Sequence, residues 1–344
     1  MKEAIIIIFV FINFTIVYNL QCGNDKLNRK PPGLLEENSN LKRKLDNEYT
    51  PIKIKVDYTQ VKIDTYNDPD IFEKLKISLD LAIHYFELLL SVQSSDFEPL
   101  LHTDLEDSCD IDNVDPNCTN WLNEYDLIIL PTYINETETN DVYASAYACL
   151  VNGQDSRPLV GRVNILPNFD FNKNNIIIFL QTILFHEITH ILVFDPYLLK
   201  QFKAIKYELV DEEVKTYIIS KRVIEKARIH FGCNSLDKLP LEDQGGEGSA
   251  GSHWEGRYML GDYMVSTSYH ENVISDITLA LFEDSGWYKA NYFTGGLFRF
   301  GKNIGCKFFE NDCLVDGKTV FPNEFCHKSK EPKCFSSHLG TGEC

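Results

Sequence analysis

The stretch IIIFLQTILFHEITHILVF, which spans Ile176–Phe194, decides the fold of this chain. It follows a polar break at 172–175 and is too long for an ordinary strand. Apolar residues occupy nearly all of its sides, as in a helix that is buried all round. The sequence therefore predicts a core helix here, with the polar pentad HEITH, 186–190, close to its C-terminal end.

The pentad places two histidines, His186 and His190, four residues apart. On a helix this spacing puts both imidazoles on one face, one turn apart, so that both can reach one metal ion. Glu187 is rotated away from the ligand position, which suits a general base that takes a proton from an attacking water. The alternative is a set of core residues satisfied by hydrogen bonds. We disfavour it, because burying these three groups among apolar neighbours is costly without a metal.

A catalytic zinc ion normally has a third protein ligand and one open position. The chain has nine histidines, and seven lie outside the pentad. These are His84, His102, His230, His253, His270, His327 and His338. His253 follows a glycine-rich stretch that could bring it to the metal, and His270 is its competitor.

The chain before the core helix alternates strand and helix patterns. Ile52, Ile54, Val56 and Tyr58 alternate with polar residues, which predicts a half-buried strand over Pro51–Asp64. A long amphipathic helix is predicted over 70–93, and strands over 125–134, 143–151 and 160–167. Strands followed by a helix on the sheet indicate an α/β unit, 51–194, that carries the HEITH helix.

The chain after the core helix has a different character. A helical but more polar segment, Tyr207–Phe231, the glycine-rich stretch and ISDITLALFEDSGWY, 274–288, predict a second, mainly helical and looped subdomain over 195–292. Half of the ten cysteines lie between Cys306 and Cys344, which predicts a disulfide-rich tail over 293–344.

The N-terminus indicates the secretory route. An apolar run at 4–17 has signal-peptide length, so 1–18 is predicted to be a signal peptide, with an uncleaved anchor as the alternative. Residues 19–50 are polar and indicate a short pro-segment or linker. No second run of spanning length follows, so no stable membrane span is expected. Ten cysteines and sequons at Asn117 and Asn135 fit a secreted glycoprotein with disulfide bonds.

The composition narrows the partners. The chain carries 33 basic and 51 acidic residues, for a net charge of −18 spread along its length. This charge argues against nucleic acid and anionic membranes as partners. The sequence does not indicate an oligomeric state.

Several segments together resemble the leishmanolysin family of metzincin zinc peptidases, in which an insertion displaces the third histidine far downstream. They are RPLVGRVNILP at 157–167, HEITHIL at 186–192, LEDQGGEGSAGSHWEGRYMLGDYM at 241–264 and ISDITLALFEDSGWY at 274–288, with a continuation through GKNIGCKFFENDC at 301–313. The resemblance implies an α/β (α+β) zincin of the metzincin type with a mixed sheet. It also implies Zn²⁺ held by His186, His190 and His253, Glu187 as catalytic base, and Met264 as the Met-turn residue beneath the metal.

Three departures from the family pattern stand out. Val193 occupies the position of the glycine in HExxHxxG, where the chain turns, and a β-branched residue is poor at positive φ. The pro-segment is short, and Cys22 is its one candidate for a latency ligand on zinc. An unpaired or disulfide-bonded Cys22, or one lost with the signal, is an equal alternative. The cysteine-rich region is also shorter than is usual in the family.

The sequence therefore predicts a secreted zinc endopeptidase that hydrolyses protein or peptide substrates. A strand of the first sheet, for which we favour YASAYA at 143–148, would pair with the extended substrate. One alternative is a catalytically weak adhesion or binding protein on the same scaffold. Another is a zinc hydrolase that acts on non-peptide substrates.

Overall fold

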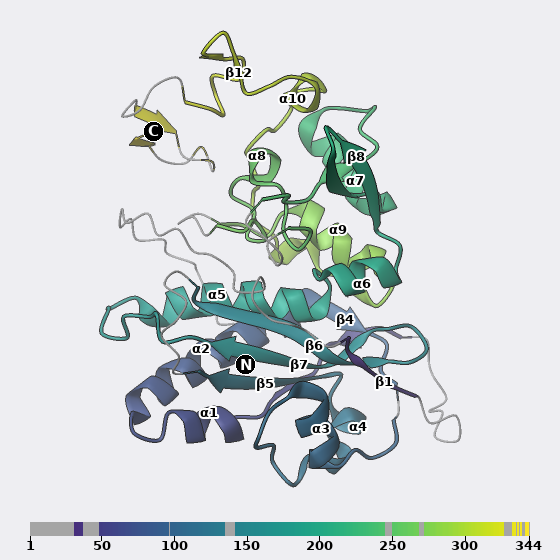
Figure 1. Ribbon diagram of the computed structural model, residues 1–344, viewed down its shortest axis with the longest axis vertical. Helices are drawn as coiled ribbons and strands as arrows, with labels where there is room; N and C mark the ends of the chain where they lie inside the picture. The colour runs from purple at the N-terminus through teal and green to yellow at the C-terminus, as the bar shows by residue number, and fades with distance from the viewer. Residues whose placement is uncertain are drawn as a thin grey trace, which may run out of the picture.

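The computed structural model describes residues 31–36, 48–95, 97–134, 142–244, 250–267, 272–326, 332–334, 336, 338 and 341–343. Its central feature is a mixed sheet with the strand order β1-β6-β7-β5-β3 (Figure 1). β3, β5 and β7 are parallel, whereas β6 is antiparallel to β7. The bounds are Gly33–Leu35 for β1, Ile54–Val56 for β3, Leu127–Tyr133 for β5, Ala144–Asn152 for β6 and Pro158–Ile165 for β7.

Helices cover both faces of this sheet. α2, Pro69–Leu89, and α5, Ile176–Leu192, share one apolar core with the sheet face that carries Ile129 and Val163. The opposite face, with Ile128 and Val160, packs against the segment that forms α3, η2 and α4. The bounds of these three elements are His102–Cys109, Cys118–Asn120 and Trp121–Glu124. The mixed sheet between helices confirms the α/β character predicted for this part of the chain.

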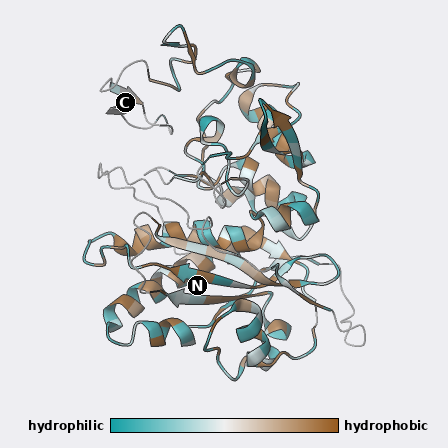
Figure 2. Ribbon diagram, viewed as in Figure 1, coloured by the Kyte–Doolittle hydropathy of each residue, from teal (hydrophilic) through white to brown (hydrophobic). Residues whose placement is uncertain are grey.

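The core helix forms where the sequence predicts it. α5 ends at Leu192, two residues before the predicted boundary, and Figure 2 shows it as largely hydrophobic. Together with α6, Pro196–Gln201, it is the one stretch of the described chain that is long and apolar enough to cross a membrane, which corrects the expectation that no run of spanning length follows 4–17. Since 67% of its apolar window is buried, it behaves as a core helix.

A glycine sets how closely this helix approaches the sheet. Gly161 of β7 lies under the last turn of α5, and a Cβ built on it would be 2.7 Å from Cδ1 of Ile191. Real carbon atoms do not approach so closely, so a larger residue at 161 would force the Ile191 side chain, or the helix that carries it, to shift. The height of HEITH above the sheet therefore depends on this glycine.

Three secondary-structure predictions are wrong. The helix predicted over 70–93 ends at Leu89, and Leu90–Val92 form the strand β4. The predicted strand over Pro51–Asp64 contains β2, Thr50–Pro51, and β3, but residues Thr59–Asp64 form the helix α1. The alternation ends at Tyr58, the residue before α1, and Oδ1 of Asp57 accepts from the backbone N and Oγ1 of Thr59, the first residue of the helix, at 2.9 and 2.7 Å.

The segment predicted as helix from Tyr207 is a hairpin over most of its length. β8, Ile205–Val210, pairs antiparallel with β9, Glu213–Ile218, and only α7, Lys221–Phe231, is helical. The two turn residues, Asp211 and Glu212, have φ of 51° and 70°. Left-handed conformations at both turn positions match the twist of the two flanking strands. The turn therefore favours a hairpin, although the apolar residues are spaced as in a helix.

After α9, Asp276–Asp284, the chain returns to the N-terminal part of the molecule and completes a separate three-stranded sheet with the order β11-β4-β2. There β11, Tyr288–Ala290, pairs antiparallel with β4, Leu90–Val92, and β2 pairs with the other edge of β4. The remaining elements are short. They are β10 (Leu239–Pro240), α8 (Gly256–Met259), η3 (Tyr292–Thr294), α10 (Lys307–Glu310), β12 (Leu314–Val315), β13 (Lys318–Thr319), β14 (Pro332–Cys334) and β15 (Thr341–Glu343).

Two disulfides link described residues. The disulfide Cys233–Cys306 links the end of α7 to the segment before α10. Cys306 of the predicted tail, 293–344, is therefore bonded to a cysteine outside that tail. Cys326 is also disulfide-bonded. The thiols of Cys118, Cys313 and Cys334 are free.

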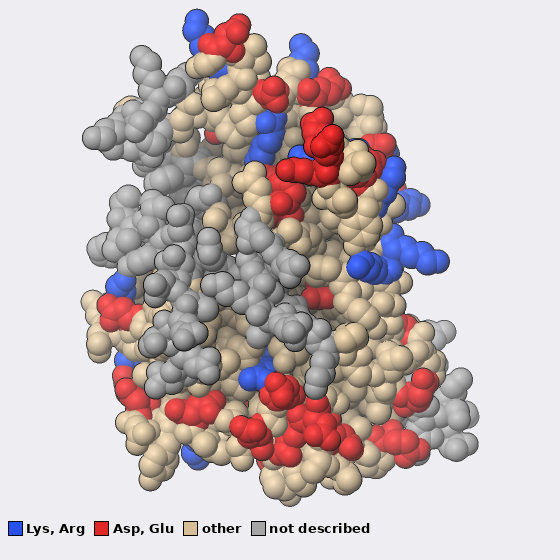
Figure 3. Space-filling view, in the orientation of Figure 1, with Lys and Arg blue, Asp and Glu red and all other residues tan. Residues whose placement is uncertain are grey.

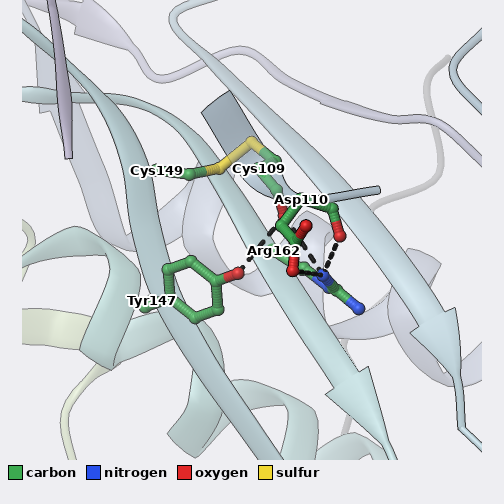
Figure 4. The surroundings of a disulfide bond; sticks show 5 residues. All are labelled: Cys109, Asp110, Tyr147, Cys149 and Arg162. Atoms are coloured by element: carbon green, nitrogen blue, oxygen red, sulfur yellow. Dashed lines mark hydrogen bonds and ion pairs between the residues drawn. A yellow bond between two sulfur atoms is a disulfide. The ribbon is translucent and has the colours of Figure 1, made fainter. Parts of the chain in front are cut away.

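The disulfide Cys109–Cys149 joins α3 to β6 (Figure 4). The carbonyl oxygen of Cys109 accepts hydrogen bonds from Tyr147 Oη and Arg162 Nη1, each at 3.2 Å. Arg162 also donates to the carbonyl of Asp110. A cation and a hydroxyl therefore satisfy the C-terminal end of α3, and this helix is fixed to the sheet both covalently and by hydrogen bonds.

Candidate metal centre

Three imidazoles meet above the C-terminal half of α5. His186 Nε2 lies 3.1 Å from His190 Nε2 and 3.2 Å from His253 Nε2. Their nitrogen atoms all lie within 4.8 Å of one another, as a group that could hold a metal ion. The helix supplies two of these side chains one turn apart, and a loop before α8 supplies the third.

The opposite nitrogen of each ring is fixed by a partner. Nδ1 of His186 lies 2.7 Å from the carbonyl oxygen of Tyr263, and Nδ1 of His190 lies 2.7 Å from the carbonyl oxygen of Phe194. Nδ1 of His253 lies 3.1 Å from Ser252 Oγ. Since a carbonyl can only accept, His186 and His190 carry their protons on Nδ1 and present bare lone pairs at Nε2.

This arrangement fits a zinc ion. Two neutral imidazoles whose Nε2 atoms carry no proton cannot hydrogen-bond to each other, so their lone pairs repel at 3.1 Å unless a cation lies between them. Burial lowers the pKa of His186 to about 4, against a smaller opposing effect of its bond to the carbonyl of Tyr263. A tetrahedral ion with Zn–N bonds of about 2.0–2.1 Å separates its nitrogen ligands by roughly 3.3–3.4 Å. The donor set and spacing therefore match.

Glu187 lies in the same turn of α5 as the first histidine and is 2% exposed. A carboxylate in so dry a place interacts strongly with charge that develops beside it. Glu187 directly follows the ligand candidate His186 on α5, and its side chain is acidic.

Val193, at the position where the family pattern has glycine, is compatible with the turn that follows α5. Its φ is −156°, so the position does not use the left-handed conformation that would favour glycine. The helix ends because Asp195 begins α6 by accepting from Tyr197 N at 2.8 Å, and Pro196 cannot extend α5. This turn places the carbonyl of Phe194 where it accepts from His190.

The segment 262–264 contacts the helix through Tyr263, whose carbonyl lies beside His186. Met264 is fully buried, and its carbonyl accepts from Trp254 N at 3.0 Å. Tyr263 Oη lies 2.9 Å from Thr189 Oγ1, within the pentad. The Met264 turn therefore contacts both the helix and the residue next to His253.

Sequence reasoning did not identify Thr189, Tyr263, Asp262 or Ser252 as parts of this site. A backbone carbonyl has no sequence signature, and an isolated Thr or Tyr in an apolar segment reads as packing. The position of Tyr263 next to Met264 was the one available signal.

Other predicted residues lie elsewhere. Cys22, Asn135, His270 and His327 are outside the described residues, and Asn117 is exposed. His230 Nε2 bonds to the carbonyl of Phe300 at 2.8 Å, His338 lies 3.5 Å from Glu324, and His84 and His102 lie on α2 and α3. The predicted substrate strand YASAYA falls on β6, and β1 pairs with Leu150–Asn152 at the other end of that strand.

Comparisons with known proteins agree on one family. A family model described as leishmanolysin matches residues 74–344. A leishmanolysin homolog from Crithidia fasciculata is 40% identical over 128 residues, which is 37% of this chain and 19% of that protein. A leishmanolysin-like peptidase from Drosophila melanogaster is 42% identical over 126 residues, 35% of this chain and 18% of that protein. Leishmanolysin from Leishmania chagasi is 30% identical over 248 residues, 70% of this chain and 40% of that protein.

Proposed function

Because this chain belongs to the leishmanolysin family of zinc metallopeptidases, we propose that it is a zinc-dependent endopeptidase that cleaves proteins or peptides. The observation that carries the proposal is the convergence of three Nε2 atoms. In His186 and His190 a backbone carbonyl accepts from Nδ1, so that Nε2 keeps a free lone pair. The matched region covers 18–19% of the Crithidia and Drosophila relatives, so the activity is inferred for this chain from its own site.

We propose that His186, His190 and His253 are the zinc ligands. A zinc ion there would supply a Lewis acid that polarises the scissile carbonyl and lowers the pKa of a water molecule. The carbonyls of Tyr263 and Phe194 orient two of the rings and make them more basic. We propose that the buried thioether of Met264 forms the apolar base of the site.

We propose Glu187 as the general base. Its carboxylate takes a proton from the attacking water and later delivers it to the nitrogen of the leaving amine. The low exposure of Glu187 supports this role, because water that is excluded from the carboxylate cannot screen its interaction with the reacting groups. Pairing of the substrate with the first half of β6 remains a proposal.

We propose that the chain follows the secretory route with its N-terminal segment, 1–18, as signal peptide and 19–50 as a short pro-segment. The disulfides and the family support an extracellular or surface location. Cys22 is the candidate that would hold the enzyme latent by occupying the open zinc position with sulfur. The adhesion alternative is less favoured because both HEITH histidines, Glu187 and His253 are all present.

The test is cleavage of a denatured protein by the purified full-length chain, before and after a mercurial that blocks thiols. We expect cleavage in at least the mercurial-treated sample, its loss on addition of a chelator and its recovery with added zinc. Zinc-loaded, mercurial-treated protein that cleaves nothing would contradict the proposal and favour the binding protein.

A further inference from the structure

A buried carboxylate connects the segments around the proposed zinc site. Asp262 is fully buried. Its Oδ1 accepts from Met264 N at 2.8 Å, and its Oδ2 accepts from Ser275 N at 3.2 Å and Thr278 Oγ1 at 2.8 Å. One side chain thus fastens the Met264 turn to the first turn of α9.

This connection extends to the third histidine. Thr278 Oγ1, which donates to Asp262, accepts from Trp254 Nε1 at 2.8 Å. Trp254 directly follows His253, and its backbone N donates to the carbonyl of Met264. The position of the His253 loop is therefore defined by bonds that lead back to Asp262 by two routes.

It also extends to the first histidine. The carbonyl of Tyr263 that holds His186 Nδ1 belongs to the residue directly after Asp262. Because Asp262 Oδ1 bonds to Met264 N, it bridges the peptide units on both sides of Tyr263. The carboxylate thereby determines where the Tyr263 carbonyl points.

We propose that Asp262 is a positioning residue for the metal centre. Its carboxylate fixes the positions of two proposed ligands, His186 and His253, relative to each other. The inference rests on the proposed zinc site. Three donors converge on this carboxylate from two segments, and an asparagine would direct its NH₂ group at one of these N–H or O–H groups. The acceptor chemistry of an acid is required at this position.

Asp57 provides a matched control. It is also a buried aspartate, 6% exposed, and it also accepts three hydrogen bonds, from Thr59 N, Thr59 Oγ1 and Asp115 N. It follows β3, an edge strand of the sheet that is separated from β6 by β5 and β7. Asp57→Asn should therefore reproduce the general cost of disturbing a buried carboxylate, without touching the metal centre.

The experiment measures the zinc dissociation constant of the full-length chain by competition with a chromogenic chelator. Asp262→Asn should weaken zinc binding about 10–100-fold, the usual effect of losing a partner behind the ligands. Asp57→Asn should bind zinc like the wild type even if its thermal stability falls. Folded Asp262→Asn with wild-type affinity, or equal weakening by Asp57→Asn, would overturn the proposal.

A second variant decides the question if Asp262→Asn does not fold. Thr278→Val keeps the shape of the side chain but removes both its bond to Asp262 and its bond from Trp254, so zinc affinity should fall several-fold. Unchanged affinity in this variant would also overturn the proposal. A wild-type chain that binds no zinc is a different outcome, because it would reject the proposed function itself.

Discussion

At the scale of single residues, the chemistry of the site depends on which nitrogen of each histidine carries its proton. Tyr263 and Phe194 act on the two rings through their backbone carbonyls, and these decide that His186 and His190 offer Nε2 lone pairs to a cation. The pentad and its helical spacing made these two histidines predictable from sequence. The partners behind them were not, because any residue can supply a backbone carbonyl.

Glu187→Gln separates metal binding from proton transfer. The amide keeps the size of the side chain but cannot accept the proton of the attacking water, so peptide cleavage should fall by about 10²–10⁴-fold. Zinc content should stay at the wild-type level, since Glu187 is not among the ligand candidates. Turnover at the wild-type rate, measured on the same zinc-loaded preparation, would show that the base is misassigned.

The ionisation of Asp262 gives a pH-dependent signature. Burial raises the pKa of Asp262 from 3.8 to about 6, against the opposing effect of its hydrogen bonds. The pKa of Asp262 is higher in the folded than in the unfolded chain, so protonation of Asp262 favours the folded state. This contribution to stability is complete below about pH 4 and is lost as the pH rises through about 6. Two pKa units correspond to about 3 kcal/mol.

The measurement is urea unfolding of metal-free wild type and Asp262→Asn from about pH 4 to about pH 7. The stability of the wild type relative to the variant should decrease across this range. A difference that stays constant with pH would contradict the raised pKa.

At the scale of elements, periodicity predicted α5 well because its length and apolar sides leave one interpretation. It failed where a local device changed the backbone direction. The helix α1 begins at Thr59, inside the segment predicted as a strand, where Asp57 accepts from Thr59 N, and the left-handed pair Asp211 and Glu212 makes a hairpin of a segment with helical spacing. The close contact of α5 with β7 was also not predictable, because Gly161 shows its role only when Ile191 lies above it.

Gly161→Ala tests this contact. The added Cβ would collide with Ile191, so we expect a loss of about 1–3 kcal/mol in the free energy of unfolding. The displaced helix should also bind zinc more weakly, because His190 precedes Ile191. Gly256→Ala is the control, since no atom lies within 4 Å of its Cβ position, and it should change stability by less than about 0.5 kcal/mol. Equal stability of the two variants would argue against a tight helix–sheet contact.

At the scale of the whole molecule, the site needs two distant parts of the chain. α5 brings two histidines, and the loop before α8 brings the third (Figure 1). Acidic side chains lie over both the lower and the upper parts of the face in Figure 3, in keeping with the net charge of −18. The resemblance carried by HEITH and the segments downstream identified the family and pointed to His253, whereas only the fold shows that His253 lies beside His186 and His190. Zinc should therefore raise the melting temperature, because it binds only the folded arrangement.

The most direct test of the central claim is the zinc content of the purified chain and of two histidine variants. The account predicts about one zinc per chain in the wild type, as expected of a three-histidine site. His84→Ala should match the wild type, because His84 is exposed on α2 with 57% of its side chain accessible. His253→Ala should lose most of the metal while remaining folded. A wild type without zinc, or a His253→Ala chain that retains a full equivalent, would contradict the assignment of the metal centre.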